Sequence, residues 1–124
     1  MKKKVLIIED DMLTVEAFLK RCESENFEIV RGRNGEEGLE IALREHPDLI
    51  LLDIVMPVMD GETMLKKLRQ DDWGKNAKVM ILTNLDSSQK IMEAVNNNTF
   101  DYLIKSDWKI DDIVEKIKSK LEDK

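Results

Sequence analysis

The 124-residue chain is poor in several residue types, and each shortage narrows the class of protein it can be. Its single cysteine, Cys22, cannot form an intramolecular disulfide and is predicted to be a small core residue, so we expect a reducing compartment, the cytoplasm. Two prolines and five glycines are too few for a collagen-like or low-complexity chain. The single histidine, His46, is predicted to lie in a loop before Pro47, and Trp73 to pack at a helix end.

Long apolar runs and a positive net charge are also missing. No apolar run approaches the roughly 20 residues that span a bilayer, so no membrane segment is predicted. The basic start leads into only four apolar residues, Val5 to Ile8, and no small-residue cleavage site follows, which argues against a signal peptide. With 26 acidic and 20 basic side chains the net charge is −6. This charge argues against direct nucleic-acid binding, because such binding depends mostly on Lys and Arg contacts to phosphates.

The chain does have the size and composition of one globular domain. It is 42% hydrophobic and 37% charged, and it contains no repeat and no Pro/Gly/Ser-rich linker. A chain of this length buries roughly two thirds of its unfolded surface. We therefore expect residues 1–124 to form a single domain.

Five short apolar runs alternate with segments of helical periodicity. The runs cover residues 5–8, 27–30, 49–52, 79–82 and 102–104. Helical spacing places on shared faces Phe18, Leu19 and Cys22; Leu39, Ala42 and Leu43; Met64, Leu65 and Leu68; Ile91, Ala94 and Val95; and Ile110, Ile113, Val114, Ile117 and Leu121. This alternation predicts a doubly wound α/β fold, in which helices cover both faces of a parallel sheet. The run at 27–30 leads into charged residues, which suits an edge strand.

Polar residues stand where the predicted strands end. They are Glu9-Asp10-Asp11, Asp53, Thr83-Asn84 and Lys105-Ser106-Asp107. In a parallel sheet these ends converge on one edge, where such folds bind their ligands. Clustered carboxylates repel one another, and a hard divalent cation with oxygen ligands, Mg²⁺, relieves that repulsion. No Cys or His belongs to the group, so zinc and copper are not expected.

Two further strand-end residues suit an anion bound to the metal. Thr83 offers a hydroxyl donor and Lys105 a cation. Together with the acidic residues, they are suited to phosphoryl transfer onto a carboxylate, which needs positioning and charge neutralisation. An aspartate is already anionic at neutral pH, so Asp53 can attack without a general base.

On these residues the sequence resembles the receiver domain of bacterial two-component response regulators, over residues 4 to about 122. The resemblance rests on the acidic pair Glu9-Asp10, on Asp53 followed by "MP" at 56–57 and "DG" at 60–61, and on Thr83 and Lys105 at the family's spacing. It implies a (βα)5 flavodoxin-like sandwich with a five-stranded parallel sheet of order 2-1-3-4-5.

The resemblance also implies a metal site around the acceptor. Asp10 and Asp53 would bind Mg²⁺ directly, Glu9 through water, and Val55 through its backbone carbonyl. Asp11 is either a further member of this acidic cluster or the N-cap of the first helix. Asp53 would accept a phosphoryl group, with slow autodephosphorylation, and would not act on a metabolite.

The remaining implied roles concern the phosphoryl group and the response to it. Lys105 would pair with its oxygens and Thr83 would hydrogen-bond to it. Tyr102 matches the aromatic residue that swings inward in the active form, so that phosphorylation shifts the fourth helix and fifth strand between two states. The implied partners are a histidine kinase or phosphotransfer protein and a downstream protein or output domain, with the receiver a monomer or a phosphorylation-dependent homodimer.

Three positions depart from the family pattern. Ser106 replaces the proline that usually follows the lysine with a cis bond, so we expect either a trans bond or a strained cis bond there, because cis costs about 2.5–4 kcal/mol before a non-proline. Asn84 is bulkier than the usual small residue. Val55 lacks a polar side chain to position water, so we expect an unusual rate of acyl phosphate hydrolysis.

Other function classes fit less well. A flavodoxin-like cofactor binder needs a phosphate-cradling loop after the first strand, where this chain has "EDDMLT". An Asp-x-Asp hydrolase needs a second aspartate at position 55, which is Val55. A pseudo-receiver that serves as a phosphorylation-independent docking module is the remaining alternative.

Overall fold

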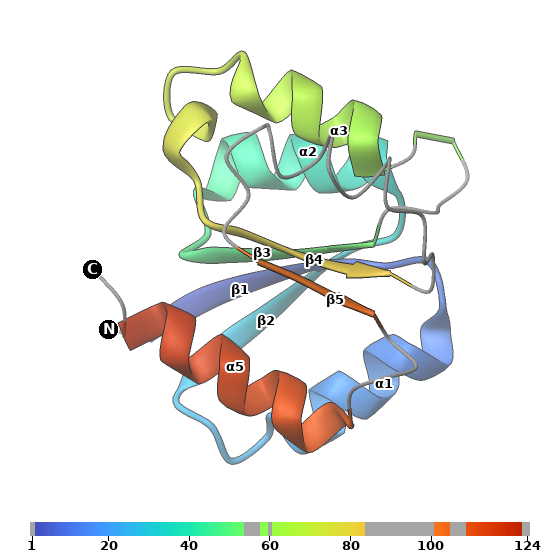
Figure 1. Ribbon diagram of the computed structural model, residues 1–124, viewed down its shortest axis with the longest axis vertical. Coiled ribbons are helices and arrows are strands. Elements are labelled where there is room, and N and C mark those ends of the chain that lie inside the picture. Colours follow the sequence, from blue (N-terminus) through green and yellow to red (C-terminus); the bar gives the residue numbers. More distant parts are fainter. Residues whose placement is uncertain (1, 54–57, 60, 84–100, 105–108, 123–124) are drawn as a thin grey trace.

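The sheet has the predicted parallel topology. The computed structural model describes residues 2–53, 58–59, 61–83, 101–104 and 109–122. Its strands are β1 (Lys3–Ile8), β2 (Phe27–Gly32), β3 (Leu49–Asp53), β4 (Val79–Thr83) and β5 (Asp101–Ile104). All neighbouring pairs are parallel, in the order β2-β1-β3-β4-β5 (Figure 1). The predicted fold class and strand order are therefore confirmed, and β2 is an edge strand.

Helices cover both faces of the sheet. They are α1 (Met12–Arg21), α2 (Gly35–Glu45), α3 (Gly61–Arg69) and α5 (Ile110–Glu122), with a short 3-10 helix η1 (Gly74–Asn76). Figure 1 shows α2 and α3 on one face and α1 and α5 on the other. The helix expected around Ile91 falls in 84–100, outside the described residues. No helix in the described ranges is long and apolar enough to cross a bilayer.

The continuous apolar runs are strands buried on both sides. In β1, Leu6 and Ile8 join the core under α2 and α3, whereas Val5 and Ile7 join the core under α1 and α5. The side chains of β3 and β4 divide between the two cores in the same alternating way. A strand with a core on each face has no polar face, which explains why period-two alternation is absent from the sequence.

Two helix-face predictions are wrong. Leu19 is 43% exposed and Leu43 is 37% exposed. Helix α1 buries Val15 with Phe18, and α2 turns Gly38, Ile41 and Ala42 inward. Leu19 and Leu43 lie at the margin of the apolar face of their helices. That face is too narrow to bury every large apolar side chain of the helix.

The end of α2 is covered by an aromatic pair. His46 is the C-cap of α2 in the left-handed conformation (φ 48°), and its backbone N–H donates to the Ala42 carbonyl. Its ring stacks on Trp73, with centroids 4.3 Å apart and planes at 10°. Trp73 therefore packs at a helix end as predicted, and the loop position of His46 is fixed by this contact.

Glycine lets α2 approach the sheet closely. A Cβ on Gly38 would lie 2.5 Å from Cδ1 of Ile8 and 2.8 Å from its Cγ2. Ile8 is fully buried, and its β-branched side chain has little rotamer freedom. The short distance between α2 and β1 at this point therefore requires a residue without a side chain at position 38.

Gly38→Ala is expected to destabilise the protein by about 1–2 kcal/mol. Alanine in a helix gains up to about 1 kcal/mol over glycine, but overpacking a full core costs about 1–3 kcal/mol. Urea unfolding measures the difference. Adding Ile8→Val removes the nearest atom and should recover part of the loss, and the exposed Glu40→Ala is the control on the same helix. A Gly38→Ala variant more stable than the wild type would contradict this packing.

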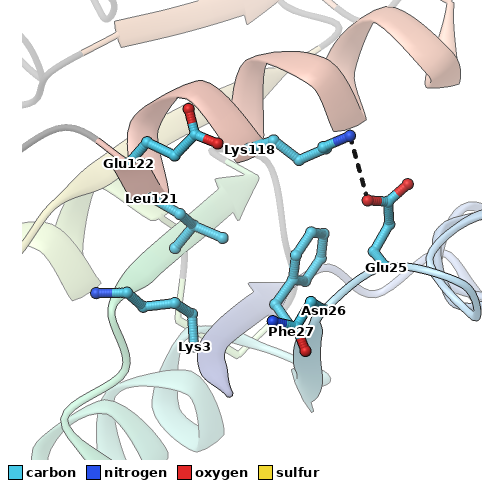
Figure 2. A pocket seen from close by; sticks show the side chains of 7 residues that line it. All are labelled: Lys3, Glu25, Asn26, Phe27, Lys118, Leu121 and Glu122. Carbon is cyan, nitrogen blue, oxygen red and sulfur yellow. Dashed lines mark ion pairs between the residues drawn. The ribbon is translucent and has the colours of Figure 1, made fainter. Parts of the chain in front are cut away.

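Ion pairs join α1 to α5 at the surface. Arg21 contacts Asp111 of α5 at 2.5 Å and Glu25 at 3.2 Å. Lys118 of α5 contacts Glu25 at 3.3 Å, as drawn in Figure 2. The hydrogen bond from Arg21, followed by that from Lys118, lowers the pKa of Glu25 below its ordinary 4.5. Glu25 thus links the end of α1 to α5 through two cations.

Glu25→Gln should lower the melting temperature at pH 7 but not at strongly acidic pH. Because the pKa of Glu25 is lower in the folded protein, its stabilisation is complete above about 4.5 and disappears as pH falls through the folded value. Melting curves of wild type and variant from pH 7 down to pH 3 should therefore converge below about 4.5. Glu23→Gln, at an exposed glutamate close by, is the control; a gap between Glu25→Gln and wild type that persists at low pH would contradict the ion-pair origin.

Candidate functional site

Three carboxylates meet at the carboxyl end of the sheet. Glu9 follows β1 and Asp53 ends β3, and these strands are neighbours whose preceding residues, Ile8 and Leu52, are paired. Asp10 comes from the same loop as Glu9. One carboxylate oxygen of each of the three residues lies within 4.8 Å of the others. The structure thus brings together three of the residues that the sequence singled out.

The group is suited to a hard divalent cation. Glu9 is 2% exposed and Asp53 is 6% exposed, whereas Asp10 is at the surface. Buried carboxylates this close to one another are costly without a counter-charge. The donors are all oxygen and include a solvent-facing member, which fits Mg²⁺ with water completing the coordination.

The loop that carries Glu9 and Asp10 is held by its own backbone. The Glu9 N–H donates to the Gly32 carbonyl at 3.0 Å, and the Asp11 N–H donates to Oε2 of Glu9 at 3.2 Å. Nη2 of Arg31 donates to the carbonyls of Glu9 and Asp10, at 3.3 and 3.4 Å. The loop therefore has a defined shape, with contacts from the neighbouring strand β2.

Asp11 caps helix α1. Its Oδ1 accepts the Leu13 N–H at 3.2 Å, and its Oδ2 accepts the Thr14 hydroxyl at 2.6 Å. It is not a member of the three-carboxylate group found in the described part of the chain. Of the two roles considered for Asp11, the geometry favours the cap.

The other predicted residues divide into two sets. Thr83 is the last residue of β4 and pairs with Ile104, and Tyr102 lies within β5 opposite Ile81. Leu82, just before Thr83, pairs with Asp53, so the strand order brings the Thr83 backbone to the acidic edge. The remaining residues, Val55, Asn84, Lys105 and Ser106, lie outside the described residues.

Arg31 is a site neighbour that the sequence reasoning missed. The sequence pattern places it only in the charged end of an edge strand. A usable signal was present, because a cation at the end of the second strand falls beside the first strand's acidic end once the order 2-1-3 is assumed. Its hydrogen bonds to the backbone carbonyls of Glu9 and Asp10 attach it directly to the acidic loop.

A separate cavity of about 530 Å³ lies at the opposite end of the sheet (Figure 2). It is formed by the starts of β1 and β2 and the end of α5, with Phe27 and Leu121 as apolar walls and Lys3 and Glu122 at the rim. The Lys118–Glu25 ion pair closes one side. Because the acidic group lies at the carboxyl ends of the strands, this cavity is not part of the candidate site.

Comparison with protein families gives one match over most of the chain. The model of the response regulator receiver domain matches residues 5–118. The response regulator PleD of Caulobacter vibrioides is 31% identical over 114 residues, which cover 92% of this chain and 24% of PleD. The polar-differentiation response regulator DivK of Brucella anthropi is 39% identical over 83 residues, 67% of this chain and 68% of DivK. The chain thus spans about a quarter of PleD and two thirds of DivK.

Solved structures give the same match. A CheY-like receiver domain protein from Methanospirillum hungatei JF-1 superposes with a TM-score of 0.89 at 28% identity, covering 98% of this chain and 95% of that one. CheY in the CheX–CheY–BeF3–Mg complex from Borrelia burgdorferi superposes with a TM-score of 0.83 at 28% identity, covering 94% and 87%.

Substitutions at Asp11 and Asp10 should separate capping from metal binding. Asp11→Ala is expected to cost about 1 kcal/mol of stability, whereas Asp11→Asn keeps a capping oxygen and should cost little. Melting curves with and without Mg²⁺ should show metal-dependent stabilisation in both Asp11 variants and its loss in Asp10→Asn. If Asp11→Asn removed the Mg²⁺ effect as fully as Asp10→Asn does, Asp11 would be a ligand and not only a cap.

Proposed function

This chain belongs to the family of response regulator receiver domains of two-component signalling, and we propose that it is a phosphorylation switch whose acceptor is Asp53. The observation that carries the proposal is the buried Asp53 carboxylate, gathered with Glu9 and Asp10 at the carboxyl end of a parallel sheet. Three carboxylates whose oxygens lie within 4.8 Å of one another form a ligand set suited to a divalent cation beside the acceptor.

Mg²⁺ is the proposed cofactor. Asp10 and Asp53 would bind it directly, Glu9 through water, and Val55 through its carbonyl. When bound, the ion supplies positive charge to the carboxylates and to the oxygens of an incoming phosphoryl group. The short loop from β1 holds Glu9 and Asp10 in place through the bonds to Gly32 and Arg31, so little reorganisation is needed for binding.

The proposed reaction is transfer from a phosphohistidine of a histidine kinase or phosphotransfer protein. An oxygen of Asp53 attacks the phosphorus atom, a P–O bond forms, and the P–N bond breaks with its electron pair leaving on the imidazole. The product is an acyl phosphate on Asp53. Its oxygens would be held by the Lys105 ammonium and the Thr83 hydroxyl, and water would later hydrolyse it.

The proposed response passes from β4 to β5. Thr83 ends β4, and the residues of β4 pair with those of β5, including Ile81 with Tyr102. A shift of Thr83 toward the phosphoryl group would therefore act on the strand that carries Tyr102. We place the surface that changes at the fourth helix and β5, where a downstream protein, an output domain or a second receiver would bind.

Beryllofluoride with Mg²⁺ should bind the wild type, because it mimics the phosphoryl group on Asp53. We expect NMR shifts around Thr83 and Tyr102, and with acetyl phosphate a mass increase of one phosphoryl group. Asp53→Asn should abolish both, since an amide cannot take the acceptor role. Asp72→Asn, at an exposed aspartate away from the site, is the matched control.

The alternative function has a distinct outcome in the same experiment. A docking-only pseudo-receiver would show no response to either reagent in the wild type. Such a result, with Mg²⁺ present and the fold intact, would overturn the proposed switch.

A further inference from the structure

The guanidinium of Arg31 lies against the backbone of the acidic loop, Glu9 and Asp10. Arg31 belongs to β2, and Glu9 follows the neighbouring strand β1. Its Nη2 contacts the backbone carbonyls of Glu9 and Asp10, and its Nη1 contacts Sδ of Met12 at 2.9 Å. The side chain therefore reaches both the loop and the first residue of α1.

Arg31 has no carboxylate partner among the described residues. Other arginines pair with acids, for example Arg33 with Glu37 and Arg21 with Asp111. The Nε of Arg31 is enclosed and has no hydrogen-bond partner in the described part of the chain. Arg31 thus holds a half-buried positive charge against the loop of Glu9 and Asp10, and it forms no ion pair with a described carboxylate.

The charge of Arg31 is a larger influence on a bound cation than its hydrogen bonds are. The two bonds to carbonyls are at the long end of the accepted range, at 3.3 and 3.4 Å, and are correspondingly weak. By contrast, a unit charge and a divalent ion separated by on the order of 10 Å in a water-like dielectric alter a binding constant by about fourfold. Repulsion between Arg31 and the ion should therefore outweigh the benefit of a steadier loop.

We propose that Arg31 is a built-in counter-charge that lowers the Mg²⁺ affinity of the site and stabilises the metal-free protein. This inference rests on the proposed function, because it takes Glu9, Asp10 and Asp53 as the metal site. Arg31 binds neither the metal nor a substrate. It acts on the bound ion electrostatically, through the positive charge that it holds against the loop.

The inference can be tested by measuring Mg²⁺ affinity with calorimetric titration, in variants that keep or remove the charge of Arg31. Arg31→Gln keeps an amide donor for the carbonyls but loses the charge, and it should bind Mg²⁺ about threefold to tenfold more tightly at low ionic strength. Arg31→Lys keeps the charge and should stay within about twofold of the wild type. Arg31→Met, which lacks both charge and donor, should tighten binding as Arg31→Gln does.

Salt and a matched control separate the field from a structural effect. The gain in Arg31→Gln should shrink at about 1 M salt, where the screening length is about 3 Å. Arg33→Gln removes a charge two residues away that is already paired with Glu37, and should change the affinity by less than about twofold. Without Mg²⁺, Arg31→Gln should melt below the wild type, and saturating Mg²⁺ should narrow that gap.

Two results would overturn the inference. If neither Arg31→Gln nor Arg31→Met bound Mg²⁺ more tightly than the wild type, the charge of Arg31 would not lower the Mg²⁺ affinity of the site. If the wild type bound no Mg²⁺ and Asp53→Asn changed nothing, the proposed metal site would fail and the inference would fail with it. The first result leaves the proposed function standing; the second does not.

Discussion

The mutual repulsion of three carboxylates is the constraint on which the acidic end of this protein depends. Parallel strands bring their carboxyl ends to one edge, and the order β1-β3 places Glu9 and Asp10 beside Asp53. The chain cannot relax this repulsion by letting β1 and β3 separate, because both strands are packed between two apolar cores. The core thus fixes the spacing, and positive charge must come from a bound ion or from nearby side chains.

The opposite end of the molecule is built from matched charges instead. There α1 and α5 are joined through Arg21, Glu25 and Lys118, with each cation next to an acid. Such surface pairs contribute modestly to stability and are weakened by salt. In the described residues, the carboxyl ends of β1 and β3 gather three acids, whereas the ion pairs at the opposite end match each cation with an acid.

The fold and the acidic group were predictable because both follow from local patterns. Continuous apolar runs identify strands buried on two faces, and polar residues at their ends identify the binding edge. The contact of Arg31 with Glu9 depends on the register between β1 and β2, so it can be anticipated only once the strand order is assumed. The stacking of His46 on Trp73 and the exposure of Leu19 likewise depend on how helices settle on the sheet.

Charge balance over the proposed cycle gives Arg31 and Lys105 different tasks. With Mg²⁺ bound, the ion and Arg31 would together match the three acids, and the proposed role of Lys105 would add the positive charge that attracts an incoming phosphoryl dianion. After transfer, Asp53 carries a group with a charge of about −1.5 to −2, and Lys105 restores the balance. In the metal-free state Arg31 would keep a positive charge at the acidic loop through its bonds to the Glu9 and Asp10 carbonyls. The Mg²⁺ affinity of the site would then be moderate, because the positive charge of Arg31 reduces the free energy gained when the ion binds.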